Sequence, residues 1–479
     1  MAPLRTPTMT RRGLFGAAGA GIVAPMLAPI LARAVPADDP WAIAAAIVAR
    51  VRPPVFPDRD FPITRFGARG DGRTNDGAAI EAAIAACAAA GGGRVVVPAG
   101  LFLTGALRLR SNVNLHLDQD ATLRFSTDPG DYPLVHTRWE GMELINYSPL
   151  VYAYRARNIA ITGTGMLDGQ GGASHWWSWK GPWQGTTGNG WRPGMPNQVP
   201  ARNRLLEMVE RRIPIAKRVF GDGAYLRPAF IQPYGCENVL IEGVKLRGSP
   251  FWQVHPVLCR NVTVRGLDIF GHGPNNDGCD PESCRDVVIE GTTFDTGDDC
   301  IAIKAGRNEQ GREIPIPSEN IVVRDCLMKE GHGGIVVGSE ISAGVRNVFG
   351  ERCRMDSPAL WYALRFKNNA MRGGVLENFH FRDLDVGTVG KAAIACDFNY
   401  EEGAKGPYRP VLRDISVERL RVAHCAQVLD AQGFASAPVE RLSIRDSRFM
   451  GVTRPSIVSH VDGLTLHDVE VNGLQVTAL

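Results

Sequence analysis

Short runs of alternating apolar and polar residues recur along most of the chain, each starting at a turn residue and ending at Gly or another polar turn. The clearest runs start at Asn158, Asn238, Asn261, Asp286, Asn320, Asn347, Asn378 and Asp414, and looser ones start at Arg441 and Gly463. From Asn238 to Asn347 the successive starts lie 23, 25, 34 and 27 residues apart. Period-two segments at such intervals, with no helix between them, predict a parallel β-helix. Asn suits its turns because it tolerates the left-handed conformation, and stacked Asn ladders are a further expectation.

We therefore predict an all-β fold, a single-stranded parallel β-helix over residues 63–479. A β-sandwich is the alternative, but it requires hairpins, and hairpin dipeptides between adjacent runs are scarce. The Ala-rich stretch Asp76–Ala90, with Asp76 at the N-cap position and glycines after it, is the only helix predicted after residue 34. It is expected to cap one open end of the apolar column, as a solenoid requires.

The N-terminus resembles an export signal. Arg11-Arg12 precedes a Gly- and Ala-rich apolar run that ends in Ala32-Arg33-Ala34, a small-x-small cleavage site. We interpret residues 1–34 as a twin-arginine-type signal peptide and residues 35–62 as a Pro-rich lead. The alternative is a membrane anchor, since the run is long enough to span a bilayer. The signal predicts a periplasmic or secreted protein that has no membrane contact once the signal is removed.

Composition narrows the range of partners. The formal net charge of +3 falls to −1 when residues 1–34 are removed, because four arginines and no acids are lost. A near-neutral chain without a basic tail gives no support for nucleic-acid binding. We expect a monomer, with local basic residues attracting any acidic ligand.

The ten cysteines lack the spacing of metal-binding pairs, and several lie about 25 residues apart. In a repeat, such spacing favours small buried residues stacked in successive coils. A disulfide framework remains the alternative, because export permits disulfides.

The longest gap between strands, about residues 170–227, is rich in aromatic residues: His175, Trp176, Trp177, Trp179, Trp183 and Trp191. Long loops on a rigid scaffold are where ligands are usually held. A loop that packs only on itself is the alternative interpretation.

Two groups of acids stand about one coil apart, since Asp277 precedes the pair Asp298–Asp299 by 21 residues. Two surface turns would explain the Asp-Gly pairs, but a β-helix would make these carboxylates neighbours. The next coils supply His332, then Arg365 and Lys367, which alternation turns away from the core together. Three acids, one histidine and two cations on consecutive coils predict a site that cleaves an acidic sugar.

The glycine before the paired acids allows a bend. If Ile301 and Ile303 point into the core, a regular strand would point Asp299 inward as well, and an unpaired buried carboxylate is costly. We therefore expect Gly297 to turn Asp298 and Asp299 outward, and a buried Asp299 would contradict this account.

Four blocks of the chain resemble the signature of the polygalacturonases, glycoside hydrolase family 28, which are inverting pectinases with a right-handed parallel β-helix. They are Asn275-Asn276-Asp277-Gly278, Gly297-Asp298-Asp299, Gly331-His332-Gly333 and Arg365-Phe366-Lys367. Asn276 and Phe366 stand where the family has Thr and Ile, and neither is a chemical group of the mechanism. The resemblance covers roughly residues 60–470, and the segment 66–77 with the Trp-rich loop is most similar to the bacterial exo-acting branch.

The resemblance implies a role for each residue. Asp298 would protonate the leaving glycosidic oxygen, and Asp277 and Asp299 would activate water on the opposite face. Inversion needs the acid and base about 6.5–9.5 Å apart, and repulsion among the acids would raise the pKa of one and keep it protonated. His332 would assist this proton balance or bind sugar hydroxyls, and Arg365 and Lys367 would bind the uronate carboxylate.

Weaker candidates for sugar contacts are Trp252 and His255, one coil before Asp277, together with Asn275 and Glu340. The expected substrate is pectic polysaccharide or oligogalacturonide, cleaved at α-1,4-galacturonosyl linkages from its ends, and no cofactor or metal is expected.

Three other interpretations stay open. A pectate-lyase-like enzyme could hold Ca²⁺ between clustered acids. A related hydrolase could act on rhamnogalacturonan or xylogalacturonan, and a non-catalytic β-helix could bind or adhere to carbohydrate.

Overall fold

The computed structural model describes residues 39–479 except 184, 186 and 187. The predicted signal peptide, residues 1–34, lies outside the described residues. Residues Pro40–Leu479 form one compact unit.

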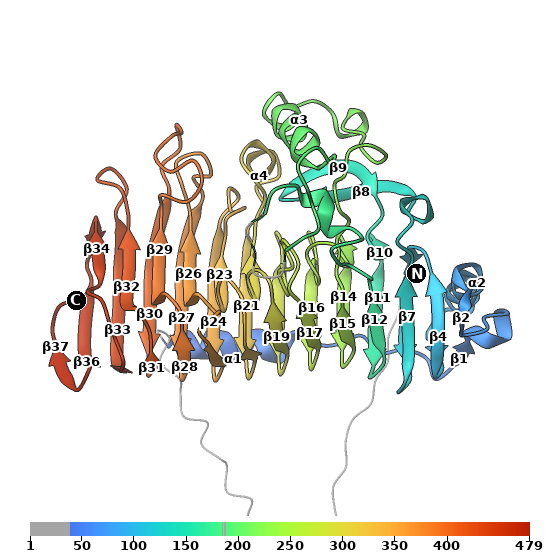
Figure 1. The fold of residues 1–479 in the computed structure, drawn as a ribbon. Coiled ribbons are helices and arrows are strands. Elements are labelled where there is room, and N and C mark those ends of the chain that lie inside the picture. The colour runs from blue at the N-terminus through green and yellow to red at the C-terminus, as the bar shows by residue number, and fades with distance from the viewer. Residues whose placement is uncertain (1–38, 184, 186–187) are drawn as a thin grey trace, which may run out of the picture. The chain divides into compact units, whose positions relative to one another are not determined.

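The described strands form three parallel faces that wind around one apolar core, coil after coil (Figure 1). The coils make the right-handed parallel β-helix that the repeating pattern and the resemblance predicted. The first face contains β1 (Asp60–Pro62), β3 (Gly93–Val97), β6 (Val113–Leu117), β11 (Arg157–Gly163), β14 (Glu237–Glu242), β16 (Arg260–Arg265), β18 (Arg285–Glu290), β21 (Ser318–Arg324), β24 (Val345–Glu351), β27 (Val375–Arg382), β30 (Val411–Glu418), β33 (Val439–Phe449) and β36 (Thr465–Val471).

The second face follows the first in each coil. Its strands are β2 (Asp71–Asn75), β4 (Gly100–Thr104), β7 (Ala121–Phe125), β12 (Met166–Asp168), β15 (Lys245–Arg247), β17 (Asp268–Gly271), β19 (Thr293–Thr296), β22 (Leu327–Met328), β25 (Arg354–Ser357), β28 (Asp385–Val389) and β31 (Arg421–His424). At the C-terminal end, β33 also pairs with β31 and β35 (Val461–Asp462), and β37 (Leu474–Val476) folds back on β36.

The third face carries the predicted site. Its strands are β5 (Leu107–Arg108), β10 (Val151–Tyr154), β13 (Ile231–Tyr234), β20 (Ile301–Ile303), β23 (Ile335–Val337), β26 (Tyr362–Lys367), β29 (Ala392–Asp397), β32 (Gln427–Gln432) and β34 (Ile457–Ser459). Between β13 and β20 the parallel pairing continues through single bridges, Ile231 to Val254, Val254 to Cys279 and Cys279 to Ile301.

The predicted Asn ladder is present on the first face. Each Asn that opens a coil has positive φ, for example 59° at Asn238 and 57° at Asn261. Its Nδ2 donates to the Oδ1 of the Asn one coil earlier, at 2.8 Å from Asn238 to Asn158 and 2.6 Å from Asn261 to Asn238. Asn therefore satisfies both the left-handed turn and the amide hydrogen bonds along the stack.

The ten cysteines are all buried and free, so the stacked arrangement is confirmed and a disulfide framework is wrong. Cys236, Cys259 and Cys284 occupy the same place in three successive coils. The Cys236 and Cys259 amides each donate to the next sulfur at 3.4 Å, and the Cys284 amide donates to Ser318 Oγ.

The predicted capping helix is α2 (Gly77–Ala89), whose Ile80, Ile84 and Cys87 close one end of the core. Asp76 stands at its N-cap position but does not cap it. Its carboxylate accepts the backbone N–H groups of Arg69 and Gly70 instead.

The predicted lead contains a helix that the sequence reasoning missed, α1 (Pro40–Arg50). Its Ala44 and Ile47 pack on Val288 and Val322, outside strands β18 and β21. Arg50 also donates to Asp286 Oδ1 at 2.6 Å. Periodicity could not reveal this contact, because it lies on the outer side of the coils.

The insertions between strands gather on one side of the coils, above the third face (Figure 1). They include the antiparallel hairpin β8 (Leu134–Trp139) and β9 (Met142–Tyr147), and the helices α3 (Val199–Glu210) and α4 (Glu309–Glu313). The 3-10 turns are η1 (Ile63–Phe66), η2 (Pro129–Asp131), η3 (Trp177–Lys180) and η4 (Ile215–Lys217). Among the described residues, no helix has the length and apolar character needed to cross a membrane.

Replacing Asn320 by Ala tests the ladder. Asn320 has a φ of 59°, donates to Asp286 Oδ1 at 3.0 Å and accepts from Asn347 Nδ2 at 3.0 Å. We expect Asn320→Ala to lower the free energy of unfolding by roughly 1–3 kcal/mol, because it strains the turn and removes both bonds. Asn320→Gly, which tolerates the turn, should lose less. Urea unfolding measures both, and equal losses would show that the turn conformation contributes nothing.

Candidate active site

The two groups of acids meet on the third face. The Gly278 amide donates to Asp299 O at 2.9 Å, and the Gln253 amide donates to Asp277 O at 3.0 Å. Asp277 therefore stands beside Asp299 on the neighbouring coil, 22 residues later, and Asp298 immediately precedes Asp299. The prediction that one coil separates the two groups is confirmed.

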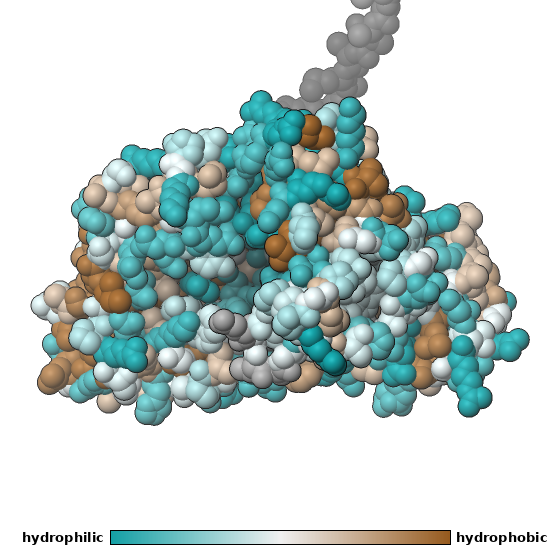
Figure 2. Space-filling view, turned by 45° about the horizontal axis from the view of Figure 1, so that its top comes forward, coloured by the Kyte–Doolittle hydropathy of each residue, from teal (hydrophilic) through white to brown (hydrophobic). Residues whose placement is uncertain are grey.

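The three carboxylates each offer an oxygen within 4.8 Å of the others. They line a cavity of about 170 Å³ together with Glu140, Lys180, Arg202, Trp252, Asn275, Lys304, Arg307, Ser339, Glu340, Lys367, Tyr400 and Glu401. Figure 2 shows a hollow with hydrophilic residues among the loops of this side. The lining is almost wholly polar and charged, which suits a charged or hydroxyl-rich ligand.

Asp299 is buried, which contradicts the expectation that both paired acids would be exposed. The chain does bend at Gly297–Asp298, and Asp299 faces the cavity while Ile301 and Ile303 enter the core. Burial is tolerated because Lys367 Nζ lies 2.6 Å from Asp299 Oδ2 and balances its charge. The expectation of an exposed Asp299 rested on the cost of an unpaired buried carboxylate, and Asp299 is paired.

Asp298 contacts the imidazole of His332, whose Nδ1 lies 2.9 Å from Asp298 Oδ1. Burial would raise the pKa of Asp298, but the adjacent imidazole outweighs this and lowers it well below its usual value. Burial would likewise lower the pKa of His332, but Asp298 raises it. These opposite shifts favour a protonated imidazole beside an ionised Asp298. His332 also stacks on Trp361 at 3.9 Å between ring centroids.

Asp277 has the opposite shift. Burial, and then the charges of Asp298 and Asp280, raise its pKa well above the ordinary value. The expected asymmetry among the acids is therefore present, but it falls on Asp277 and not on Asp298, because His332 contacts only Asp298. The prediction that repulsion raises the pKa of one acid is confirmed at Asp277, whereas Asp298, which the resemblance names as the proton donor, has a lowered pKa.

Lys304 sits among three acids beneath the cavity. Its Nζ lies 3.6 Å from Asp277, 3.5 Å from Asp280 and 3.3 Å from Glu340. Burial would raise the pKa of Glu340, but Lys304 and then Arg307 lower it. Lys304 was not predicted to be a site residue, although it directly follows Ile303 in the segment that carries Asp298 and Asp299.

The predicted cations stay together in the structure, because both lie against the ring of Tyr400, Arg365 at 5.5 Å and Lys367 at 5.2 Å from its centre. Leu364 and Phe366 enter the core as alternation predicted. Lys367 and Tyr400 line the cavity, and Arg365 is not among the lining residues.

Of the weaker candidates, three line the cavity and one does not. Trp252 and Asn275 line the cavity, with Lys304 Nζ 4.3 Å from a Trp252 ring centre, and Glu340 lines it as an ion-pair partner. His255 does not reach the cavity, because it is buried with one ring nitrogen on Gln232 and the other on Glu282.

The insertions supply residues that the sequence reasoning missed. Arg202 from α3 pairs with Glu140 from the β8–β9 hairpin at 2.6 Å, and Arg307 pairs with Glu401 at 2.8 Å. These segments carry no repeat, so nothing in the sequence placed them near the acids. Together they wall one side of the cavity.

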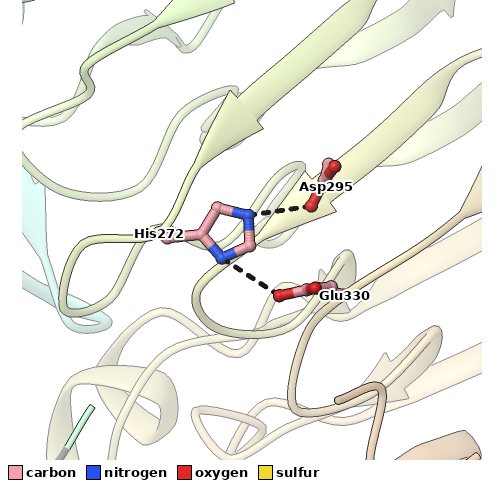
Figure 3. Close-up of side chains that lie close together, drawn as sticks. All are labelled: His272, Asp295 and Glu330. Carbon is pink, nitrogen blue, oxygen red and sulfur yellow. Dashed lines mark hydrogen bonds and ion pairs between the residues drawn. The ribbon is translucent and has the colours of Figure 1, made fainter. Parts of the chain in front are cut away.

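Figure 3 shows a second group of titratable residues, His272, Asp295 and Glu330. His272 Nε2 is 2.8 Å from Asp295, and its Nδ1 is 3.4 Å from Glu330. His272 and Glu330 line a neighbouring cavity of about 330 Å³ that also includes His332 and Trp361. The His332–Asp298 pair therefore stands between two cavities.

Comparison with known proteins gives a consistent result. A model described as glycosyl hydrolases family 28 matches residues 221–424, and a model described as rhamnogalacturonase A/epimerase, pectate lyase-like, matches residues 61–178. An exopolygalacturonase structure from Thermotoga maritima is 43% identical, with 91% of this chain and 97% of that chain covered and a TM-score of 0.87.

Curated relatives are more distant. A probable polygalacturonase from Vitis vinifera is 28% identical over 79% of this chain and 72% of that protein. An exo-poly-alpha-D-galacturonosidase from Dickeya chrysanthemi is 28% identical over 71% of this chain and 57% of its own length.

Lys304→Met should make folding sharply dependent on pH. The change leaves Asp277, Asp280 and Glu340 without their shared cation, and breaking a buried ion pair costs about 3–5 kcal/mol. Carboxyls whose pKa is raised on folding bind more protons in the folded state, so their cost grows as pH rises. The loss in unfolding free energy should therefore be larger near pH 7 than near about pH 4.

Urea unfolding at the two pH values measures the effect. Lys245→Met, at an exposed lysine of β15, is the matched control and should change little. An equal loss at both pH values for Lys304→Met would contradict the electrostatic explanation.

Proposed function

The chain belongs to glycosyl hydrolase family 28, and from that membership we propose that it hydrolyses α-1,4-galacturonosyl linkages at the ends of pectic polysaccharide or oligogalacturonides. The observation that carries this proposal is the cluster of Asp277, Asp298 and Asp299 on one wall of a small charged cavity. The names of the Thermotoga and Dickeya relatives, both exo-acting, support it.

The size of the cavity favours attack at a chain end. Pockets for drug-sized ligands usually measure about 300–1,000 Å³, and the space beside the acids is about 170 Å³. The ion pairs Arg202–Glu140 and Arg307–Glu401 wall it. One terminal sugar would enter, and the rest of the polymer would extend toward the neighbouring cavity that contains His332 and Trp361.

Asp298 is placed to act as the general acid, because it lies between the two cavities where the scissile bond would sit. His332, whose pKa is raised, lies 2.9 Å from Asp298 and would carry the proton before substrate binds. Transfer from Nδ1 to Oδ1 gives a neutral imidazole and a protonated Asp298, which can protonate the leaving oxygen. His332 in this scheme stores the proton that Asp298 donates.

Asp299 and Asp277 would hold the attacking water. Lys367 balances the charge of Asp299, which makes Asp299 the suited general base. Asp277, whose pKa is raised, would orient the same water. Asp277 is the second candidate for the general acid, because its raised pKa keeps it protonated.

The stereochemistry does not follow from spacing. One oxygen of each carboxylate lies within 4.8 Å of the others, whereas the carboxyl groups of inverting enzymes usually stand roughly 6.5–9.5 Å apart. We propose inversion on family membership, with water held between two carboxylates of the cluster.

A Ca²⁺-dependent lyase reaction is the second candidate function, since the three acids could ligate a cation. Lys304 and Lys367 already lie against the cluster and balance part of its charge, which disfavours a divalent cation there. Release of ultraviolet-absorbing unsaturated products, abolished by a chelator, would support the lyase. Binding of oligogalacturonides without turnover would support a non-catalytic role. Faster cleavage of rhamnogalacturonan or xylogalacturonan would support a related hydrolase.

We also propose that residues 1–34 direct export by a twin-arginine route. Replacing Arg11 and Arg12 by Lys should leave the chain in the cytoplasm with its signal attached, because that route reads the arginine pair. Fractionation and mass measurement of the N-terminus test this, and unchanged export of the double variant would contradict it.

Asp298→Asn should lower hydrolysis of oligogalacturonides by about 10²-fold or more. Cleavage of an aryl α-galacturonide should lose far less, because a good leaving group needs little protonation. Asp299→Asn should impair both substrates, because water activation is needed for each. End-product analysis of the wild type should show monomer alone.

The outcome separates the two candidate acids. If Asp277→Asn shows the leaving-group rescue and Asp298→Asn does not, Asp277 is the acid. Near-wild-type hydrolysis of oligogalacturonides by both variants would overturn the assignment of the site.

A further inference from the structure

The Trp-rich loop brings one lysine to the cavity wall. The cavity-lining cations are Lys180, Arg202, Lys304, Arg307 and Lys367. The last four each contact a carboxylate within 4.0 Å: Arg202–Glu140, Lys304–Glu340, Arg307–Glu401 and Lys367–Asp299. Lys180 alone among them makes no hydrogen bond or ion pair with any residue that the structure describes.

Several hydrogen bonds hold the backbone on both sides of Lys180. Lys180 ends the turn η3, in which Trp177 Nε1 donates to Ser249 O at 2.8 Å. Asn189 Nδ2 donates to the carbonyls of Trp177 at 3.2 Å and Gly181 at 2.8 Å, so it bridges the turn. The Gln198 amide donates to Trp179 O at 2.7 Å.

Aromatic packing fixes the same turn. Trp176 is buried and meets Tyr132 edge to face at 5.5 Å between ring centroids. Trp179 meets Trp176 at 4.9 Å and Tyr225 at 5.4 Å, also edge to face. The loop is therefore packed on the scaffold, and its tryptophans support the position of Lys180 more than they expose aromatic surface.

Holding an unpaired ammonium in such a site is unfavourable by itself. Burial lowers the pKa of Lys180, and the Glu140 carboxylate only partly offsets this. A fixed, partly desolvated cation facing a cavity is an arrangement that an anionic ligand would stabilise. The other cations there have their charges balanced by protein carboxylates.

We propose that Lys180 binds the carboxylate of the uronate held in the cavity and so selects uronates over neutral sugars. This inference rests on the proposed function. It also gives the Trp-rich loop a role, since the predicted partner Arg365 lies outside the cavity and Lys367 is bound to Asp299.

Kinetics of Lys180→Met test the assignment. KM for an aryl α-galacturonide and for trigalacturonate should rise by about 10-fold to 100-fold, the range for a lost hydrogen bond to a charged group, with kcat nearly unchanged. The methyl ester of the aryl substrate, which lacks the negative charge, should show little change in KM. Lys180→Arg should restore most of the binding of the acid.

Lys217→Met, in the same insertion at an exposed lysine of η4, is the matched control and should behave as the wild type. If Lys180→Met does not fold, as judged by circular dichroism, Lys180→Gln takes its place. An unchanged KM for the acid, or an equal rise for the ester, would overturn the proposal. A wild type that releases no sugar from oligogalacturonides would instead refute the proposed function.

Discussion

Backbone hydrogen bonds between successive coils place Asp277 beside Asp299, and every other feature of the site depends on that register. A shift by one residue would turn these side chains toward the apolar core. The bend before Asp298 is equally constrained, because a Cβ on Gly297 would lie 2.6 Å from the backbone of His272. The coil below thus fixes the path of the chain that carries the acids.

The chemistry that these neighbouring acids can perform depends on how their buried charges are balanced. Asp277, Asp280 and Asp299 are all buried, which is tolerable only because Lys304 and Lys367 lie against them. The surroundings shift the acids in opposite directions. The adjacent His332 lowers the pKa of Asp298, whereas the pKa of Asp277 is raised. Chemically similar carboxylates are thereby given different proton affinities, as acid–base catalysis requires.

The sequence predicted whatever follows from the coil period. That includes the β-helix, the Asn ladder, the stacked cysteines, the adjacency of Asp277 and Asp299, and the alternation at Arg365–Lys367. It could not predict the burial of Asp299 or the direction of the shift at Asp298, because these depend on side-chain contacts with Lys367 and His332. The sequence could not predict that Lys180 and Arg202 line the cavity either, because the insertions have no repeat from which to infer their position.

The division between coils and insertions has a chemical consequence. The coils hold the clustered carboxylates at fixed spacing, while the insertions supply part of the cavity wall, which in the proposed function limits how much of a polymer can enter. Their wall consists of opposite charges, Arg202 with Glu140 and Arg307 with Glu401. Such pairs largely cancel each other, so the wall excludes further sugars without attracting an anion. The unbalanced positive charge facing the cavity is then that of Lys180, on a turn fixed by tryptophans, and a uronate entering beside three acids needs such a charge.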